Sequence, residues 1–117
     1  VEHLLEERAG ALSTGQRRLV ELARVVAGEF SVLLLDEPSS GLDRVETEHL
    51  AGVVGRVVAD RGCAVLMVEH DMSLVMEICP ELHVLDFGRL IFSGGAQDAR
   101  RDGAVRSAYL GEGALVS

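Results

Sequence analysis

The sequence contains no lysine, because all eleven of its basic residues are arginines. A phosphate-binding loop of the form GxxxxGK[ST] requires a lysine, so this chain cannot contain one. No apolar run approaches the roughly 20 residues that span a bilayer, and the N-terminus has no signal-peptide pattern. We therefore expect a soluble chain whose link to any membrane is made through a partner protein.

Positive charge and metal-binding patterns are also scarce. The 11 basic residues stand against 19 acidic ones, and the formal net charge of −8 argues against nucleic acid as the main ligand. Cys63 and Cys79 have no CxxC spacing and form no zinc pattern with the four histidines. We expect both cysteines to be reduced residues with a packing role.

What is present is the composition of a folded α/β protein. The 117 residues suffice for one domain, and the 48% that are hydrophobic exclude a disordered tail. Helical periodicity, apolar runs and turn signals predict helices at 14–27, 44–60 and 72–79, strands at 32–35 and 64–69, a hairpin of 82–85 with 90–92, and weak helices within 96–110. Because a helix joins the first two strands, we expect those strands to be parallel.

Two adjacent carboxylates, Asp36 and Glu37, follow the apolar strand 32–35. A strand that is apolar on both faces belongs inside a parallel sheet covered by helices, where ligands collect beyond the carboxyl ends of the strands. Successive strand side chains point to opposite sides, so one carboxylate can hold a cation while its neighbour faces a water. His70 follows the second strand and is expected at the same edge. The pattern indicates a metal-nucleotide site there.

A second candidate site lies at the start of the helix 14–27. Ser13 and Gln16 have the spacing of a capping box, and Gly15 allows a backbone to approach a ligand closely. A helix N-terminus offers amide donors to an anion. An ordinary helix cap and an anion-binding turn both account for these residues.

Four motifs in this order closely resemble the C-terminal half of an ABC-transporter ATPase domain: LSTGQ at 12–16, LLDEP at 34–38, SGLD at 40–43 and EHD at 69–71. The resemblance covers essentially the whole chain. It implies an α/β fold that is a partial P-loop NTPase core, with parallel strands, flanking helices and a C-terminal hairpin. It also implies that 1–29 end a helical subdomain and that 30–117 form the C-terminal part of the ATPase core.

The resemblance implies specific roles for the site residues. Asp36 resembles the Walker B aspartate that holds Mg²⁺, Glu37 resembles the general base that polarises the attacking water, and His70 resembles the switch histidine that hydrogen-bonds the γ-phosphate of ATP. The LSTGQ turn resembles the signature motif, which contacts ATP held by the opposite subunit of a dimer; the residues concerned are Ser13, Gly15 and Gln16. Asp43 resembles the end of the D-loop. Thr14 replaces the commoner glycine, and its β-branched side chain restricts the backbone there.

In that family the Walker A loop, the adenine-stacking aromatic residue and the Q-loop glutamine precede the signature motif, and this chain lacks them. We therefore expect the chain alone to bind ATP weakly and not to hydrolyse it. The intact protein is expected to be a cytoplasmic ATPase subunit that pairs with a second such subunit and sits against membrane permease subunits. Residues 69–72, 84–88 and 108–111 resemble importers of branched-chain amino acids or related solutes.

Several other interpretations stay open. A soluble ABC protein acting on ribosomes or DNA is disfavoured by the acidic composition, whereas a non-catalytic dimerisation or docking module is compatible with it. A metal hydrolase would use Asp36, Glu37, His70 and Asp71. Residues 86–88 read Asp-Phe-Gly, but without an HRD motif or a lysine they predict a hairpin turn and not a kinase element.

Overall fold

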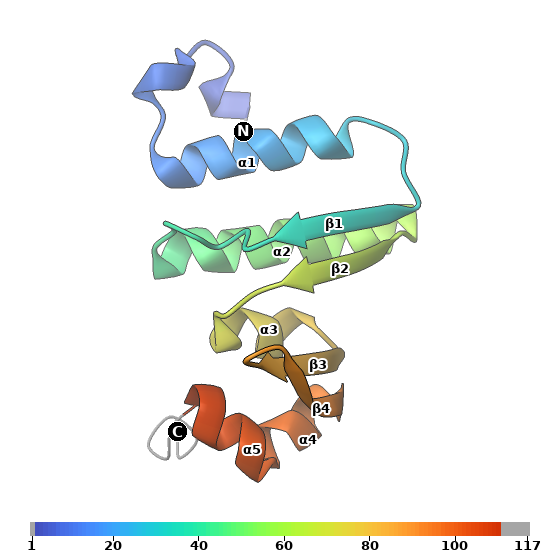
Figure 1. Cartoon of the computed structure of the whole chain (residues 1–117). Coiled ribbons are helices and arrows are strands. Elements are labelled where there is room, and N and C mark those ends of the chain that lie inside the picture. The colour runs from blue at the N-terminus through green and yellow to red at the C-terminus, as the bar shows by residue number, and fades with distance from the viewer. Residues whose placement is uncertain (1, 111–117) are drawn as a thin grey trace. The chain divides into compact units, whose positions relative to one another are not determined.

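The computed structural model describes residues 2–110, which form two compact units that meet in sequence between Glu69 and His70. Figure 1 shows their helices and strands. The first unit comprises η1 (Glu2–Leu4), η2 (Ala9–Ala11), α1 (Thr14–Val26), β1 (Val32–Asp36), α2 (Arg44–Arg61) and β2 (Ala64–Val68). The second comprises α3 (Met72–Ile78), β3 (Glu81–Asp86), β4 (Arg89–Gly95), α4 (Ala96–Arg101), α5 (Gly103–Val105) and η3 (Arg106–Leu110). The functional division expected from the sequence, at 29/30, stays a prediction.

The first unit is built on a parallel pair of strands. β1 pairs with β2 in a register that runs from Val32 opposite Ala64 to Asp36 opposite Val68, which confirms the predicted parallel arrangement. α2 connects the two strands and lies behind them in Figure 1. At its far end Arg61 donates a hydrogen bond to the carbonyl of Gly28 at 2.7 Å. The connection between α1 and β1 is thereby fastened to the end of α2.

Only one face of this sheet is buried. Leu33 is 2% exposed, whereas its neighbour Leu34 is 69% exposed. The same alternation leaves Leu66 60% and Val68 58% exposed on β2. The expectation that both faces of these strands are covered by helices is therefore wrong for the described residues. The reason is that strand side chains alternate between faces and α2 covers only one of them.

The second unit has its own hydrophobic core beneath an antiparallel hairpin. Leu82 and Val84 of β3 are buried with Ala99 and Val105 from the helices that follow. The hairpin turn consists of Phe87 and Gly88, with φ of 46° and 76°. Two positive φ values are the mark of a type I′ turn. The predicted hairpin, with its glycine in the turn, is confirmed.

Two further expectations concern the cysteines and the membrane. Cys63 and Cys79 are both free thiols, and Cys63 is buried, as expected for reduced packing residues. Burial raises the pKa of the Cys79 thiol. Among residues 2–110, no helix has both the length and the apolar character needed to cross a membrane.

Candidate functional site

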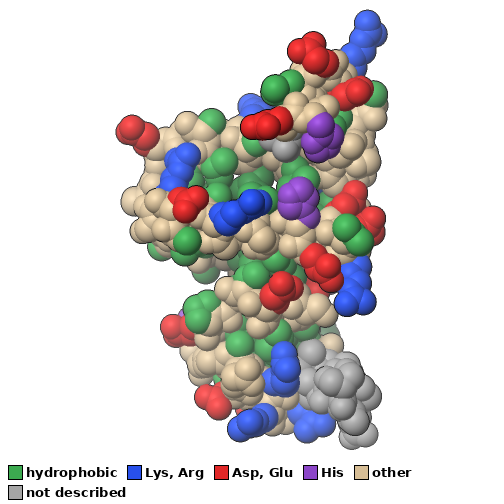
Figure 2. All heavy atoms as spheres, turned by 180° about the vertical axis from the view of Figure 1, so that it is seen from behind, with side chains coloured by type: hydrophobic (Ala, Val, Ile, Leu, Met, Phe, Trp, Pro, Cys, Tyr) green, Lys and Arg blue, Asp and Glu red, His purple; other side chains and the backbone are tan. Residues whose placement is uncertain are grey.

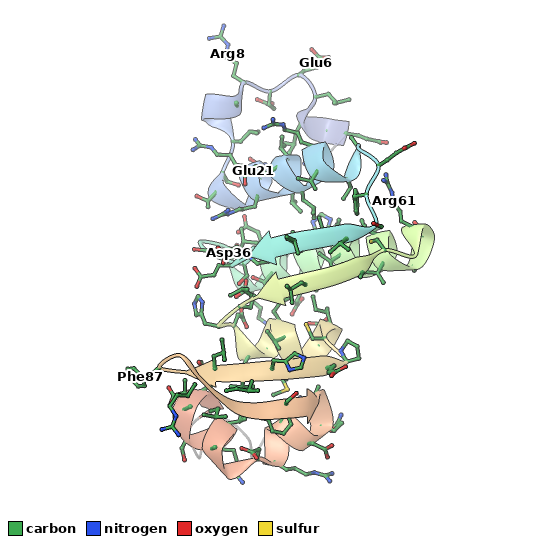
Figure 3. The ribbon with its side chains drawn as sticks, turned by 45° about the vertical axis from the view of Figure 1, so that its right-hand side comes forward. Glu6, Arg8, Glu21, Asp36, Arg61 and Phe87 are labelled. Carbon is green, nitrogen blue, oxygen red and sulfur yellow. The ribbon has the colours of Figure 1, made fainter. Side chains whose placement is uncertain are left out.

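The carboxyl end of β1 carries Asp36 and Glu37, and both are exposed. Asp36 is the last residue of the strand, where Figure 3 labels it, and lies opposite Val68 in the sheet register. Glu37 leaves the strand with a left-handed backbone, φ 46°. Its N–H donates to the carbonyl oxygen of Val68 at 2.8 Å. A non-glycine residue rarely adopts this conformation, and such residues cluster at functional sites.

The turn after Glu37 is tied to the residue that follows β2. Ser39 is buried, at 8% exposed, and both its N–H and its hydroxyl donate to Oε1 of Glu69, at 2.8 and 2.7 Å. The N–H of Ser40 donates to the carbonyl oxygen of Glu37 at 3.1 Å. The backbone on both sides of Glu37 is thus anchored to the last residues of the second strand.

Ser13 and Gln16 form the predicted capping box at the start of α1. The hydroxyl oxygen of Ser13 accepts from the N–H of Gln16 at 3.2 Å, and Oε1 of Gln16 accepts from the N–H of Ser13 at 2.8 Å. The helix-cap interpretation is therefore confirmed. The role of these side chains toward a phosphate stays a prediction.

Gly15 is buried and lies against α2. A Cβ atom at Gly15 would be 2.3 Å from Cδ and from Oε1 of Glu46, so any other residue here would displace the end of the Glu46 side chain. A Cβ atom at Gly41, whose φ is 78°, would be 2.9 Å from the methyl carbon of Thr14. The group that lies against Gly15 is thus a side chain of the same chain, and the approach of Gly15 to a ligand stays a prediction.

Asp43 begins α2 as its N-cap. Its Oδ1 accepts from the N–H of Glu46 at 2.8 Å, and Oε2 of Glu46 accepts from the N–H of Asp43 at 3.0 Å. The carboxylate of Glu46 therefore both completes this capping box and packs on Gly15. The structure brings the LSTGQ turn, through Gly15, against the residues that follow Asp43. A role of Asp43 between two subunits stays a prediction.

The chain is similar to known proteins of ABC transporters. A family model described as ABC transporter matches residues 1–40. BraF of Pseudomonas aeruginosa, a high-affinity branched-chain amino acid transport ATP-binding protein, is 38% identical over 89% of this chain and 41% of its own length. LptB of Haemophilus influenzae, a lipopolysaccharide export system ATP-binding protein, is 30% identical over 96% of this chain and 46% of its own.

The fold of the chain is also similar to that of solved structures. The chain matches MJ1267, an ATP-binding cassette of an ABC transporter, with a TM-score of 0.82 and 27% identity over 94% of this chain and 45% of that one. It also matches cbiO1 of Clostridium perfringens, part of the ABC transporter complex cbiONQ, with a TM-score of 0.78 and 29% identity. The chain is similar to part of these ABC-transporter ATP-binding proteins. It spans less than half the length of these relatives, and its fold is the mixed α/β fold of the ABC cassette that the sequence predicted.

The acidic and histidine side chains of the candidate site can be compared with the ligands that Mg²⁺ requires. Among residues 2–110, no group of three or more His, Cys, Asp or Glu side chains is arranged to hold a metal ion. Mg²⁺ in nucleotide sites requires only one or two carboxylates besides phosphate oxygens and waters. The exposed carboxylate of Asp36 fits that smaller requirement.

His70 and Asp71 open the second unit. Asp71 caps α3, since its Oδ1 accepts from the N–H of Leu74 at 3.1 Å. His70 is exposed and follows the end of β2 by two residues. The sharing of one site by His70 and Glu37, which the sequence pattern predicted, stays a prediction.

The sequence reasoning missed two features of the site. The Asp43–Glu46 capping box has a readable signal, an acidic N-cap with glutamate three residues later. The hydrogen bonds between Ser39 and Glu69 join residues 30 positions apart, and no local pattern announces them. They become visible only when the two strands are placed side by side.

Proposed function

We propose that this chain provides the water-activating side of the ATP site in an ABC-transporter ATPase subunit. The observation that carries the proposal is the position of Glu37, exposed and left-handed directly after Asp36 at the carboxyl end of β1. A carboxylate held there beside a metal-bound triphosphate can orient a water for in-line attack on the γ-phosphorus.

Each site residue has a distinct task in this proposal. The Asp36 carboxylate would hold Mg²⁺, which when bound neutralises charge on the phosphate oxygens. Glu37 polarises the attacking water and accepts its proton. His70 donates a hydrogen bond to the γ-phosphate and orients it. A group that is already in place needs no costly reorganisation during the reaction, so the anchored backbone of Glu37 supports its assignment as the base.

The LSTGQ turn is proposed to meet ATP held by a second ATPase subunit. Ser13 uses an oxygen lone pair in the capping box, and a hydroxyl that accepts in this way still has a proton to donate to a phosphate. The first N–H groups of α1 and its positive dipole end favour the same ligand. Gly15, Gln16 and Asp43 would shape and position this contact across the dimer.

The proposed cargo is a branched-chain amino acid or a related solute. The 38% identity to BraF and the 34% identity to LivG of Salmonella typhimurium support it. Lipopolysaccharide export is the second candidate, because LptB proteins match 96% of this chain at 30 to 32% identity. In both cases permease subunits would carry the cargo, and the ATPase would lie at the inner face of the membrane.

The surface charge supports a protein partner over nucleic acid. Figure 2 shows acidic and basic side chains interspersed over one face of the molecule, and the formal net charge is −8. Phosphate-backbone binding requires a continuous basic surface. This composition disfavours a soluble ABC protein acting on ribosomes or DNA, and the experiment that follows separates an ATPase from a non-catalytic docking module.

Titration of the purified chain with ATP, with and without Mg²⁺, tests the proposal. We expect weak binding that Mg²⁺ strengthens, and no hydrolysis by the chain alone. Asp36→Asn should remove the effect of Mg²⁺, whereas Glu37→Gln should leave binding intact. In the intact protein Glu37→Gln should lower kcat by about 10²- to 10⁴-fold. Absence of nucleotide binding under both conditions would favour the docking module instead.

A further inference from the structure

One carboxylate fastens the turn after β1 to the end of β2. Oε1 of Glu69 accepts two hydrogen bonds from Ser39, one from its N–H at 2.8 Å and one from its hydroxyl at 2.7 Å. Ser39 is only 8% exposed, so water competes little for these donors. Hydrogen bonds to an ionised acceptor are roughly twice as strong as neutral ones. We call this pair the Ser39–Glu69 clamp.

The Ser39–Glu69 clamp restrains the backbone of Glu37, which lies two positions before Ser39. Glu37 has φ 46°, a conformation that persists in a non-glycine residue only when its surroundings enforce it. On one side its N–H is held by the carbonyl of Val68 at 2.8 Å. On the other side its carbonyl accepts from the N–H of Ser40, the neighbour of clamped Ser39, at 3.1 Å. Val68 and Glu69 are consecutive, so one strand end supplies both anchors.

We propose that Ser39 and Glu69 are positioning residues for Glu37, an inference that rests on the proposed function of Glu37 as the general base. Loss of the clamp removes the anchor that Glu69 gives to residues 38–40, and with it a restraint on ψ of Glu37. Glu37 then relaxes toward the ordinary β or right-handed region, and its carboxylate moves away from the attacking water. Misplacing a catalytic group by about 1 Å costs on the order of 10²-fold in rate.

The chemistry of the acceptor allows matched variants. Glu69→Gln keeps an amide oxygen that accepts from both Ser39 donors, but without charge assistance. Glu69→Leu keeps similar bulk and removes the acceptor. Ser39→Ala removes one of the two donors and retains the other. Glu48→Gln is the control, because Glu48 is another carboxylate of the first unit and pairs with exposed Arg44 at 3.1 Å.

The first measurement concerns the backbone and requires no ATP. In the 117-residue chain, NMR should show at Glu37 the strong amide-to-Hα NOE within the residue that a positive φ produces. We expect Glu69→Leu to abolish it, Ser39→Ala to weaken it, and Glu69→Gln and Glu48→Gln to retain it. If Glu69→Leu does not fold, Ser39→Ala carries the comparison. A left-handed Glu37 in both Glu69→Leu and Ser39→Ala overturns the proposal.

The second measurement concerns catalysis in the intact ATP-binding protein. Glu69→Leu should lower kcat about 10- to 100-fold with little change in KM for ATP, and Glu69→Gln should recover most of the loss. Glu48→Gln should match the unsubstituted protein. Unchanged kcat in Glu69→Leu overturns the proposal and leaves the proposed function standing. If the unsubstituted protein hydrolyses no ATP, the proposed function fails, and the NMR comparison still decides whether the clamp sets the backbone of Glu37.

Discussion

The two β-structures of the chain bury their apolar residues differently. In the antiparallel hairpin of the second unit, Leu82 is 5% and Val84 is 8% exposed, and both pack into a local core with residues of the following helices. In the parallel pair of the first unit, α2 covers one face, while Leu34 and Leu66 are 69% and 60% exposed on the other.

The two units are therefore stabilised by different kinds of interaction. The hairpin and its helices form a closed core from neighbours in sequence. The parallel pair carries the candidate catalytic carboxylates on a sheet stabilised from one side, so its geometry depends more on polar anchors such as the Ser39–Glu69 clamp and the capping boxes.

The largest expected effect tests the one-sided burial of β1. Leu33→Ala should destabilise the first unit by about 2–5 kcal/mol, because it leaves a cavity under α2, whereas Leu34→Ala should cost less than about 0.5 kcal/mol. Urea unfolding, with hydrogen exchange of the β1 and α2 amides, measures both variants. Equal losses for the two neighbours would mean that the outer face is covered in solution and that the comparison between the sheets is wrong.

A smaller effect tests whether loss of a helix cap in one unit leaves the stability of the other unit unchanged. Asp43→Ala removes the N-cap of α2, and Asp71→Ala removes that of α3; each should cost about 1–2 kcal/mol. We expect Asp43→Ala to increase hydrogen exchange in α2 and its surroundings but not in β3 or β4, and Asp71→Ala to do the reverse. Ser and Asn at either position restore a cap and serve as rescue controls. Exchange changes spread over both units would contradict independent cores.

Features of this structure that are determined by residues close in sequence could be predicted, whereas features that depend on contacts between distant residues could not. The Ser13–Gln16 cap, the turn at Phe87 and Gly88 and the parallel strands follow from residues close in sequence or from connection rules, and all are confirmed. The exposure of Leu34 could not be predicted in this way, because an apolar strand face is buried only if another element packs on it.

The candidate site shows the same limit. Asp36 and Glu37 were recognised from a short motif, but the conformation of Glu37 and the bonds that enforce it were not. Those bonds come from Val68 and Glu69, which reach the site only through strand pairing. The contact between Gly15 and the Glu46 carboxylate likewise joins two helices that are distant in sequence. The motif located the chemistry, and tertiary contacts determine its geometry.

Two residues with the same unusual backbone allow a direct comparison between the units. Glu37 and Phe87 both have φ 46°, one at the candidate site and one at a hairpin turn whose side chain is 99% exposed. Asparagine tolerates this conformation better, so Phe87→Asn and Glu37→Asn should each raise stability by up to about 1 kcal/mol. Only Glu37→Asn should abolish ATP hydrolysis by the intact protein. If Glu37→Asn destabilises the first unit, the strain at Glu37 is offset by contacts of its own carboxylate.

The smallest expected effect concerns the pH dependence of the second unit. Burial raises the pKa of Cys79 in the folded chain above its unfolded value of about 8.5. The folded state therefore binds the thiol proton more tightly, so this contribution to stability is present below the unfolded pKa and is lost as the pH rises through the folded one. Unfolding midpoints of the unsubstituted chain and of Cys79→Ala, measured from pH 7 to about pH 10, should diverge least at the alkaline end.

Alkylation of Cys79 should likewise require a higher pH than that of an exposed thiol, because only the thiolate reacts. A rate equal to that of a model thiol would mean that Cys79 is open to solvent, and that the core of the second unit is less closed than that under α2.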